Sequence, residues 1–141
     1  MGNKTSSSMK INFEDVQFVV KNPENHLLIS TLDISLQDCL IVNTIDIFLE
    51  EEIINNLIKQ GKKEIKIIVY GKNCNDEKIF IKYNQLISLG FSNVFVYTGG
   101  MFEWLLLQDI YGENGFQTTS AQMDILKYKP NKALNISLLK Y

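Results

Sequence analysis

The chain has 141 residues, the usual size of one domain with a continuous hydrophobic core. Its composition is 45% hydrophobic and 21% charged, which excludes an intrinsically disordered protein. The formal net charge of −2 argues against nucleic-acid binding, because proteins that bind nucleic acid need a strongly basic face.

The residue types that are rare or absent exclude further kinds of functional site. The chain has no Arg, so no side chain can hold a phosphate through two parallel hydrogen bonds. Its two cysteines and single histidine form neither a disulfide framework nor a metal-site pattern, and we expect a cytoplasmic protein without a metal or other cofactor. No apolar run reaches the ~18 residues of a membrane-spanning helix. Abundant Lys, Asn and Ile with scarce Ala are typical of an AT-rich genome, such as that of a protist or a large DNA virus.

The first elements of the chain are a tail, a helix and a series of strands. Residues 1–10 are polar and rich in Ser, which predicts a flexible tail. Residues 13–20 have apolar side chains at helical spacing, and Asn22-Pro23 ends this helix. Short apolar runs bounded by polar turns then predict strands over residues 27–30, 39–42, 65–70 and 94–97. Because these runs are continuous and not alternating, we expect strands that are covered on both faces.

Amphipathic helices separate these strands. They are predicted over residues 50–59, 76–89 and 101–111, and each is followed by a glycine that can end it. Strands that alternate with helices at this spacing predict an α/β fold with a mainly parallel sheet and helices on both faces. Residues 11–112 would form this domain, and residues 113–141 would pack on it as an extension.

The most informative segment covers residues 65–104. It contains the strand IKIIVY, the loop GKNCNDEK, a helix, and then LGFSNVFVYTGG followed by MFEW. This order resembles the second half of a rhodanese-like domain, in which a helix ending at GF-x-NV is followed by GG-x-x-x-W. The resemblance covers roughly residues 10–112 and implies the three-layer rhodanese-like fold. Gly99 and Gly100 also fit a strand-to-helix turn with positive φ, and Trp104 fits a core residue.

The resemblance also implies where the chemistry would lie. An active rhodanese carries a persulfide on a Cys directly after the strand, in a loop whose N–H groups and following helix stabilise a thiolate. In this chain Gly71 stands at that position, directly after Tyr70, and Cys74 lies three residues later. The candidate loop comprises Gly71, Lys72, Asn73, Cys74, Asn75, Asp76 and Glu77.

Two interpretations of this loop remain open. In one, a longer loop moves the nucleophile to Cys74, and the protein is a thiosulfate or protein-persulfide sulfurtransferase. In the other, Gly71 has replaced the nucleophile and Cys74 is an incidental thiol. We favour the second, because such a loop is built around its first residue. Asp76 and Glu77 also place negative charge near Cys74, which disfavours a thiolate, although capping the following helix is sufficient reason for both.

The remaining candidates have structural explanations. Protein phosphatases related to rhodanese use a Cys-x5-Arg loop, which a chain without Arg cannot form. Cys39 lies in an apolar run, so we expect a buried core residue. His26 precedes a strand and follows a proline turn, and we expect a surface loop residue rather than a catalytic base.

The N-terminus carries one modification motif. The sequence MGNKTS matches M-G-x-x-x-[ST], which makes Gly2 a candidate for N-myristoylation and for attachment to a membrane surface. A single myristoyl chain binds membranes only marginally, and Lys4 and Lys10 add too little charge for a second signal. Stable attachment would therefore need an unidentified protein partner or packaging in a virion.

These observations predict a non-catalytic rhodanese-like binding or structural module. The alternatives are a sulfurtransferase that uses Cys74 and a membrane-associated redox or sulfur sensor in which Cys74 is merely oxidisable.

Overall fold

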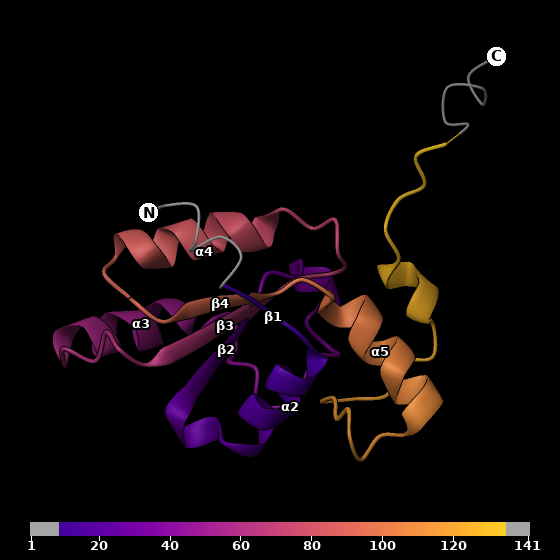
Figure 1. Ribbon diagram of the computed structural model, residues 1–141, viewed down its shortest axis with the longest axis horizontal. Coiled ribbons are helices and arrows are strands. Elements are labelled where there is room, and N and C mark those ends of the chain that lie inside the picture. Colours follow the sequence, from indigo (N-terminus) through magenta and orange to yellow (C-terminus); the bar gives the residue numbers. More distant parts are fainter. Residues whose placement is uncertain (1–8, 135–141) are drawn as a thin grey trace.

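The computed structural model describes residues 9–134 and shows a four-stranded parallel sheet between two layers of helices (Figure 1). The strands are β1 (Lys10–Ile11), β2 (His26–Ser30), β3 (Lys66–Tyr70) and β4 (Val94–Tyr97). They lie in the order β1-β4-β3-β2, and each neighbouring pair is parallel. The predicted α/β fold, with a parallel sheet and helices on both faces, is confirmed.

The helices divide between the two faces of the sheet. Helices α3 (Glu50–Lys59) and α4 (Lys78–Ser88) cover one face, and α2 (Phe13–Lys21) and α5 (Gly100–Tyr111) cover the other (Figure 1). Short 3₁₀ helices occur at η1 (Pro23–Asn25), η2 (Ile34–Leu36) and η3 (Ile125–Tyr128). No helix within residues 9–134 is long and apolar enough to cross a membrane.

Each face of the sheet has its own hydrophobic core. On the α3–α4 face, the core contains Leu27, Ile29, Ile67, Val69, Val94 and Val96 from the strands and Ile54, Ile79 and Leu86 from the helices. On the other face, it contains Leu28, Ile68, Tyr70 and Tyr97 from the strands and Val16, Val19, Met101, Trp104 and Leu105 from the helices. Successive strand residues thus enter opposite cores, which explains why the strands have continuous apolar sequences.

The start of α2 is fixed by its own side chains. Asn12 Oδ1 accepts a hydrogen bond from the Asp15 N–H, and Asp15 Oδ2 accepts one from the Asn12 N–H, both at 3.1 Å. This capping box satisfies two N–H groups that would otherwise have no partner at the beginning of a helix.

The predicted strand over residues 39–42 is wrong. The structure has only isolated bridges there, Leu28 with Thr44 and Ile41 with Thr118. Cys39 and Ile41 are nevertheless buried, because the segment lies beneath the chain that follows α5. Its N–H groups bond mainly to that chain: the Leu40 N–H donates to Thr119 Oγ1 at 3.0 Å and the Val42 N–H to the Gln117 carbonyl at 3.1 Å. The apolar run was a correct signal of burial but not of sheet pairing.

Two further segments join the core without a clear sequence signal. Strand β1 pairs with β4 through Lys10 and Ile11, and the preceding Met9 carbonyl accepts a hydrogen bond from the Val96 N–H at 2.8 Å. After α5, Phe116 and Tyr128 are buried in the core on the α2–α5 face. The described part of the chain beyond Gly112 therefore packs on the domain.

Candidate functional site

The loop of residues 71–77 lies at the carboxyl end of the sheet, where it connects β3 to α4. The first turn of α5 holds the start of this loop. The Met101 N–H donates to the Gly71 carbonyl and the Phe102 N–H donates to the Lys72 carbonyl, both at 2.9 Å. Gly100 permits this approach, because it has a φ of +68° and a Cβ atom there would lie 2.8 Å from the Gly71 oxygen. The second glycine of the Gly99-Gly100 pair thus has the positive φ expected from the sequence.

The centre of the loop is occupied by the Asp76 carboxylate. Asp76 Oδ2 accepts a hydrogen bond from the Lys72 N–H at 2.9 Å, and Oδ1 accepts one from the Lys78 N–H at 3.0 Å. The Thr31 hydroxyl lies 3.5 Å from Oδ2. One carboxylate therefore accepts the N–H of the first residue of α4 and also reaches back to the beginning of the loop, a double role that helix capping alone did not predict.

Gly71 lies directly against this carboxylate. A Cβ atom built on Gly71 would be 2.3 Å from Asp76 Oδ2 and 2.8 Å from both Asp76 Cγ and Thr31 Oγ1. These distances are far below a van der Waals contact, so a side chain at position 71 and the observed Asp76 carboxylate exclude each other. The space in which a side chain on the first loop residue would begin is filled by an anionic group of the protein itself.

Asn73 ties the loop to the C-terminal part of the chain. Its side chain is buried, its Oδ1 accepts from the Asn75 N–H at 2.9 Å, and its Nδ2 donates to the Tyr128 carbonyl at 2.8 Å. The Asp76 N–H closes the turn by donating to the Asn73 carbonyl at 3.1 Å. The middle of the loop is therefore fixed by a segment more than fifty residues away, and sequence reasoning missed this contact.

A cleft of about 420 Å³ lies over the loop. Its polar lining includes three lysines, three asparagines and two aspartates, and Leu32 and Leu36 complete it; the polar residues are Asp33, Lys72, Asn73, Asn75, Asp76, Lys78, Lys129 and Asn131. Lys78 Nζ pairs with Asp33 Oδ1 at 2.7 Å, and this ion pair lowers the pKa of Asp33 and raises that of Lys78.

Cys74 does not line this cleft. Its side chain is exposed to solvent, and its described hydrogen bond is a weak one to Asn75 Oδ1 at 3.8 Å. Glu77 is also exposed and lies at the boundary of α4. The structure thus brings Gly71, Lys72, Asn73 and Asp76 together at the centre of the loop and leaves Cys74 outside it.

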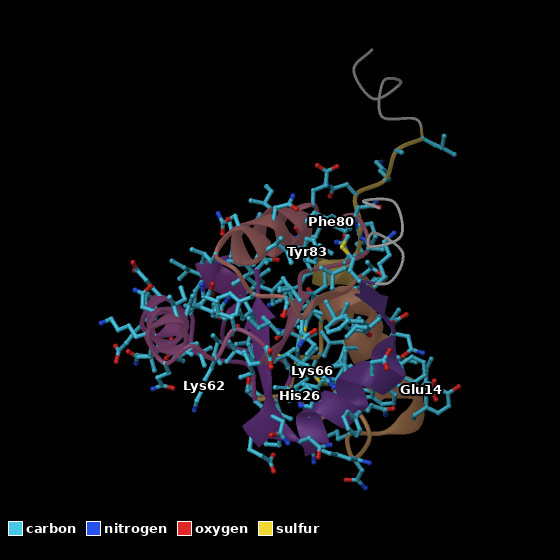
Figure 2. All side chains as sticks on the ribbon, turned by 60° about the vertical axis from the view of Figure 1, so that its left-hand side comes forward. Glu14, His26, Lys62, Lys66, Phe80 and Tyr83 are labelled. Atoms are coloured by element: carbon cyan, nitrogen blue, oxygen red, sulfur yellow. The ribbon has the colours of Figure 1, made fainter. Side chains whose placement is uncertain are left out.

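The other thiol and the histidine lie elsewhere. Cys39 is buried, as expected, and burial raises the pKa of its thiol. His26 is not a loop residue, because it begins β2 beside Lys66 of β3, and Figure 2 shows both at the amino end of the sheet, away from the loop. His26 Nδ1 lies 2.8 Å from the Asn22 carbonyl oxygen and donates to it. Within residues 9–134, no three His, Cys, Asp or Glu side chains are grouped so as to hold a metal ion. Gly2 lies outside the described residues.

Residues 40–107 match the sequence profile of the rhodanese-like domain. The chain contains a rhodanese-like domain. No curated protein gave a significant match to the sequence.

Solved structures show the same rhodanese fold. The rhodanese-like domain of an Anabaena sp. protein, determined by solution NMR, is 22% identical, with a TM-score of 0.57 over 89% of this chain and 86% of that chain. The single-domain sulfurtransferase RDL2 of Saccharomyces cerevisiae is 17% identical, with a TM-score of 0.54 over 72% of this chain and 92% of that chain. A protein from Bacillus halodurans is 20% identical, with a TM-score of 0.56 over 91% and 95%.

Proposed function

We propose that this rhodanese-like domain is a non-catalytic binding or structural module. The observation that carries the proposal is the Asp76 carboxylate, which fills the space beside Gly71 and accepts the hydrogen bond of the Lys72 N–H. In the rhodanese pattern this is where a sulfur nucleophile on the first loop residue would begin. An anion built into the loop removes both the room for that nucleophile and the stabilisation that loop amides offer to a thiolate.

Cys74 is a poor replacement for the missing nucleophile. It is exposed, lies outside the cleft, and its described hydrogen bond is the weak contact with Asn75. Catalysis by a thiolate depends on donors aimed at the sulfur, and a displacement of ~1 Å can cost on the order of a hundredfold in rate. The alternative function, a thiosulfate or protein-persulfide sulfurtransferase, rests on Cys74 alone.

The deciding experiment is a cyanide-coupled thiosulfate assay on the full chain and on Cys74→Ser. We expect negligible turnover in both, and no persulfide on the intact protein after incubation with thiosulfate. Turnover that disappears in Cys74→Ser would overturn the proposal and establish Cys74 as the nucleophile.

A matched pair of variants tests the role of Asp76. Gly71→Cys alone introduces a thiol against the carboxylate, whereas Gly71→Cys with Asp76→Ser introduces the same thiol after the carboxylate has been removed. We expect persulfide formation only in the double variant. Equal persulfide formation at position 71 in the single and the double variant would show that Asp76 does not block the loop.

The N-terminal motif completes the proposed function. We propose that Gly2 is myristoylated and that the module is held at a membrane surface or in a virion together with a protein partner. Mass spectrometry of protein from its native source should show loss of Met1 and the mass of one myristoyl group, and Gly2→Ala should abolish both that mass and membrane partitioning. An unmodified Gly2 in native protein would contradict this part of the proposal.

A further inference from the structure

Five lysines gather at the amino end of the sheet. Because parallel strands are joined by crossover helices, each helix returns toward the amino ends of the strands and finishes there. Lys21 and Lys59 occupy the last turns of α2 and α3. Lys62 and Lys63 lie in the turn after α3, and Lys66 begins β3. Figure 2 turns this end of the molecule toward the reader and labels Lys62 and Lys66. We call these five lysines the amino-end surface.

The amino-end surface is a region of positive charge on an acidic protein. The segments that carry it, residues 21–26 and 59–66, contain two acidic residues, Glu24 and Glu64, so their net charge is +3. The whole chain has a net charge of −2. Neither of the two ion pairs found within residues 9–134 involves any of the five lysines. Their charge is therefore available to an anionic partner.

Helix dipoles explain only part of this charge. A lysine in the last turn of a helix stabilises the negative end of the helix dipole, which accounts for Lys21 and Lys59. Lys62, Lys63 and Lys66 lie outside the helices, so this explanation does not apply to them.

The turn that carries Lys62 and Lys63 is fixed by backbone hydrogen bonds. Gly61 has a φ of +71°, which allows the chain to leave α3, and the Lys62 N–H donates to the Leu57 carbonyl at 2.9 Å. The Lys63 carbonyl accepts a hydrogen bond from the Ser92 N–H at 3.2 Å. The fold thus holds these lysines on a firm support, and Lys62 is exposed to solvent.

A hollow of about 860 Å³ opens on the amino-end surface. Lys62 and Lys66 line it together with three apolar residues, Phe18, Leu57 and Ile65. The Phe18 side chain is 57% exposed. Lysines beside an exposed aromatic ring suit the boundary between lipid headgroups and acyl chains, because the charges meet the headgroups while the ring enters the apolar layer.

From these observations we infer that the amino-end surface binds the anionic headgroups of a membrane. The inference rests on the proposed attachment through Gly2, since one myristoyl chain needs a second signal and Lys4 and Lys10 add too little charge. The fold supplies that signal from lysines that are distant in the sequence. They come from α2, α3 and the sheet itself, and so span all three layers of the domain. A layer of mobile headgroups can meet charges spread this widely, and each lysine should raise partitioning about fivefold.

The test measures sedimentation of the full chain with vesicles of phosphatidylcholine, with and without phosphatidylserine. The protein carries Gly2→Ala, so that no acyl chain contributes. We expect binding only when phosphatidylserine is present, and weaker binding as added salt shortens the Debye length from ~30 Å at about 0.01 M to ~10 Å at about 0.1 M. Lys62→Gln combined with Lys66→Gln should lower the partition coefficient about 25-fold.

A second pair of substitutions controls for net charge. Lys127→Gln combined with Lys132→Gln removes the same charge from exposed lysines of the C-terminal segment and should leave the partition coefficient unchanged. Equal effects of the two pairs, or binding that does not depend on phosphatidylserine, would overturn the inference. Lysine-dependent binding to polyglutamate without binding to vesicles would also overturn it, because the partner would then be an acidic protein.

Failure of this inference differs from failure of the proposed acylation. Unmodified Gly2 in native protein would remove the lipid anchor, but the vesicle result obtained with Gly2→Ala would still stand. A myristoylated Gly2, together with vesicle binding that does not change when Lys62 and Lys66 are replaced, would overturn only the role of the amino-end surface.

Discussion

Replacing Gly71 with Ala tests the central contact of the loop. The added methyl group would lie 2.3 Å from Asp76 Oδ2, so either the loop is strained or the carboxylate moves and loses the Lys72 N–H. Overpacking typically costs about 1–3 kcal/mol, and loss of a hydrogen bond to a charged group costs a similar amount, so we expect a loss of about 2 kcal/mol in unfolding free energy. The backbone contributes no cost, because the φ of Gly71 is not positive.

Combining Gly71→Ala with Asp76→Ala tests whether the two positions compete for the same space. Asp76→Ala alone removes the acceptor of the Lys72 and Lys78 N–H groups, and we again expect a loss of about 2 kcal/mol. In the double variant the clash with the carboxylate is absent, so its loss of unfolding free energy should be smaller than the sum of the two single losses by about 1–2 kcal/mol.

Urea unfolding, followed by the fluorescence of Trp104, the only tryptophan, measures the unfolding free energy of the wild type, the two single variants and the double variant. Gly115→Ala is the control, because its added methyl group meets only the flexible end of Gln17, and it should change stability by less than about 0.5 kcal/mol. Losses that add within about 0.5 kcal/mol would refute the reasoning, because they would mean that position 71 and Asp76 do not compete for the same space.

Three further substitutions or conditions should change stability in defined directions. Tyr70→Phe removes the buried hydroxyl that accepts the Ile41 N–H at 3.1 Å, and urea unfolding should show a loss of about 1–3 kcal/mol; an unchanged midpoint would mean that water replaces the hydroxyl. Asn12→Ala removes half of the capping box with Asp15 and should cost about 1 kcal/mol by the same measurement, whereas Asn12→Ser should retain most of it. Burial, and then the hydrogen bond to a carboxylate, raise the pKa of Tyr97 above its ordinary value of 10.0. The unfolded chain therefore ionises first, so stability is retained below pH 10.0 and falls as the pH rises beyond it. Burial also raises the pKa values of Tyr70 and Tyr128, so Tyr97→Phe should make this alkaline decline less steep without removing it; an equally steep decline in the variant would contradict the assignment.

The sequence predicted the central strands well because their burial is two-sided. Residues 27–30, 65–70 and 94–97 are apolar apart from Ser30 and Lys66, since alternate side chains enter the two cores. Residues 39–42 carry the same signal for another reason, which is burial beneath the segment around Gln117. Strand β1 has two residues, one of them a lysine, and so short a strand leaves no periodicity to detect.

The candidate site was predictable in position but not in arrangement. The order of motifs placed Gly71 at the first position of the loop, and the structure keeps it there. The direction of the Asp76 carboxylate could not be predicted, because a residue suited to capping a helix can equally turn back into the loop. Thr31 and Tyr128 contact the loop from distant parts of the chain, and single residues without a motif give no sequence signal for such contacts.

The short edge strand has a mechanical consequence. A force that pulls on the chain before Lys10 enters the sheet through β1, whose two residues form the shortest strand in the described fold. The five-residue pair of β2 and β3 lies at the other side of the sheet and carries none of this load directly. Under tension β1 should therefore detach from β4 before the central strands separate. Ile11 would leave the core with it, and the chain up to α2 would lengthen while the loop at the carboxyl end of β3 stays intact.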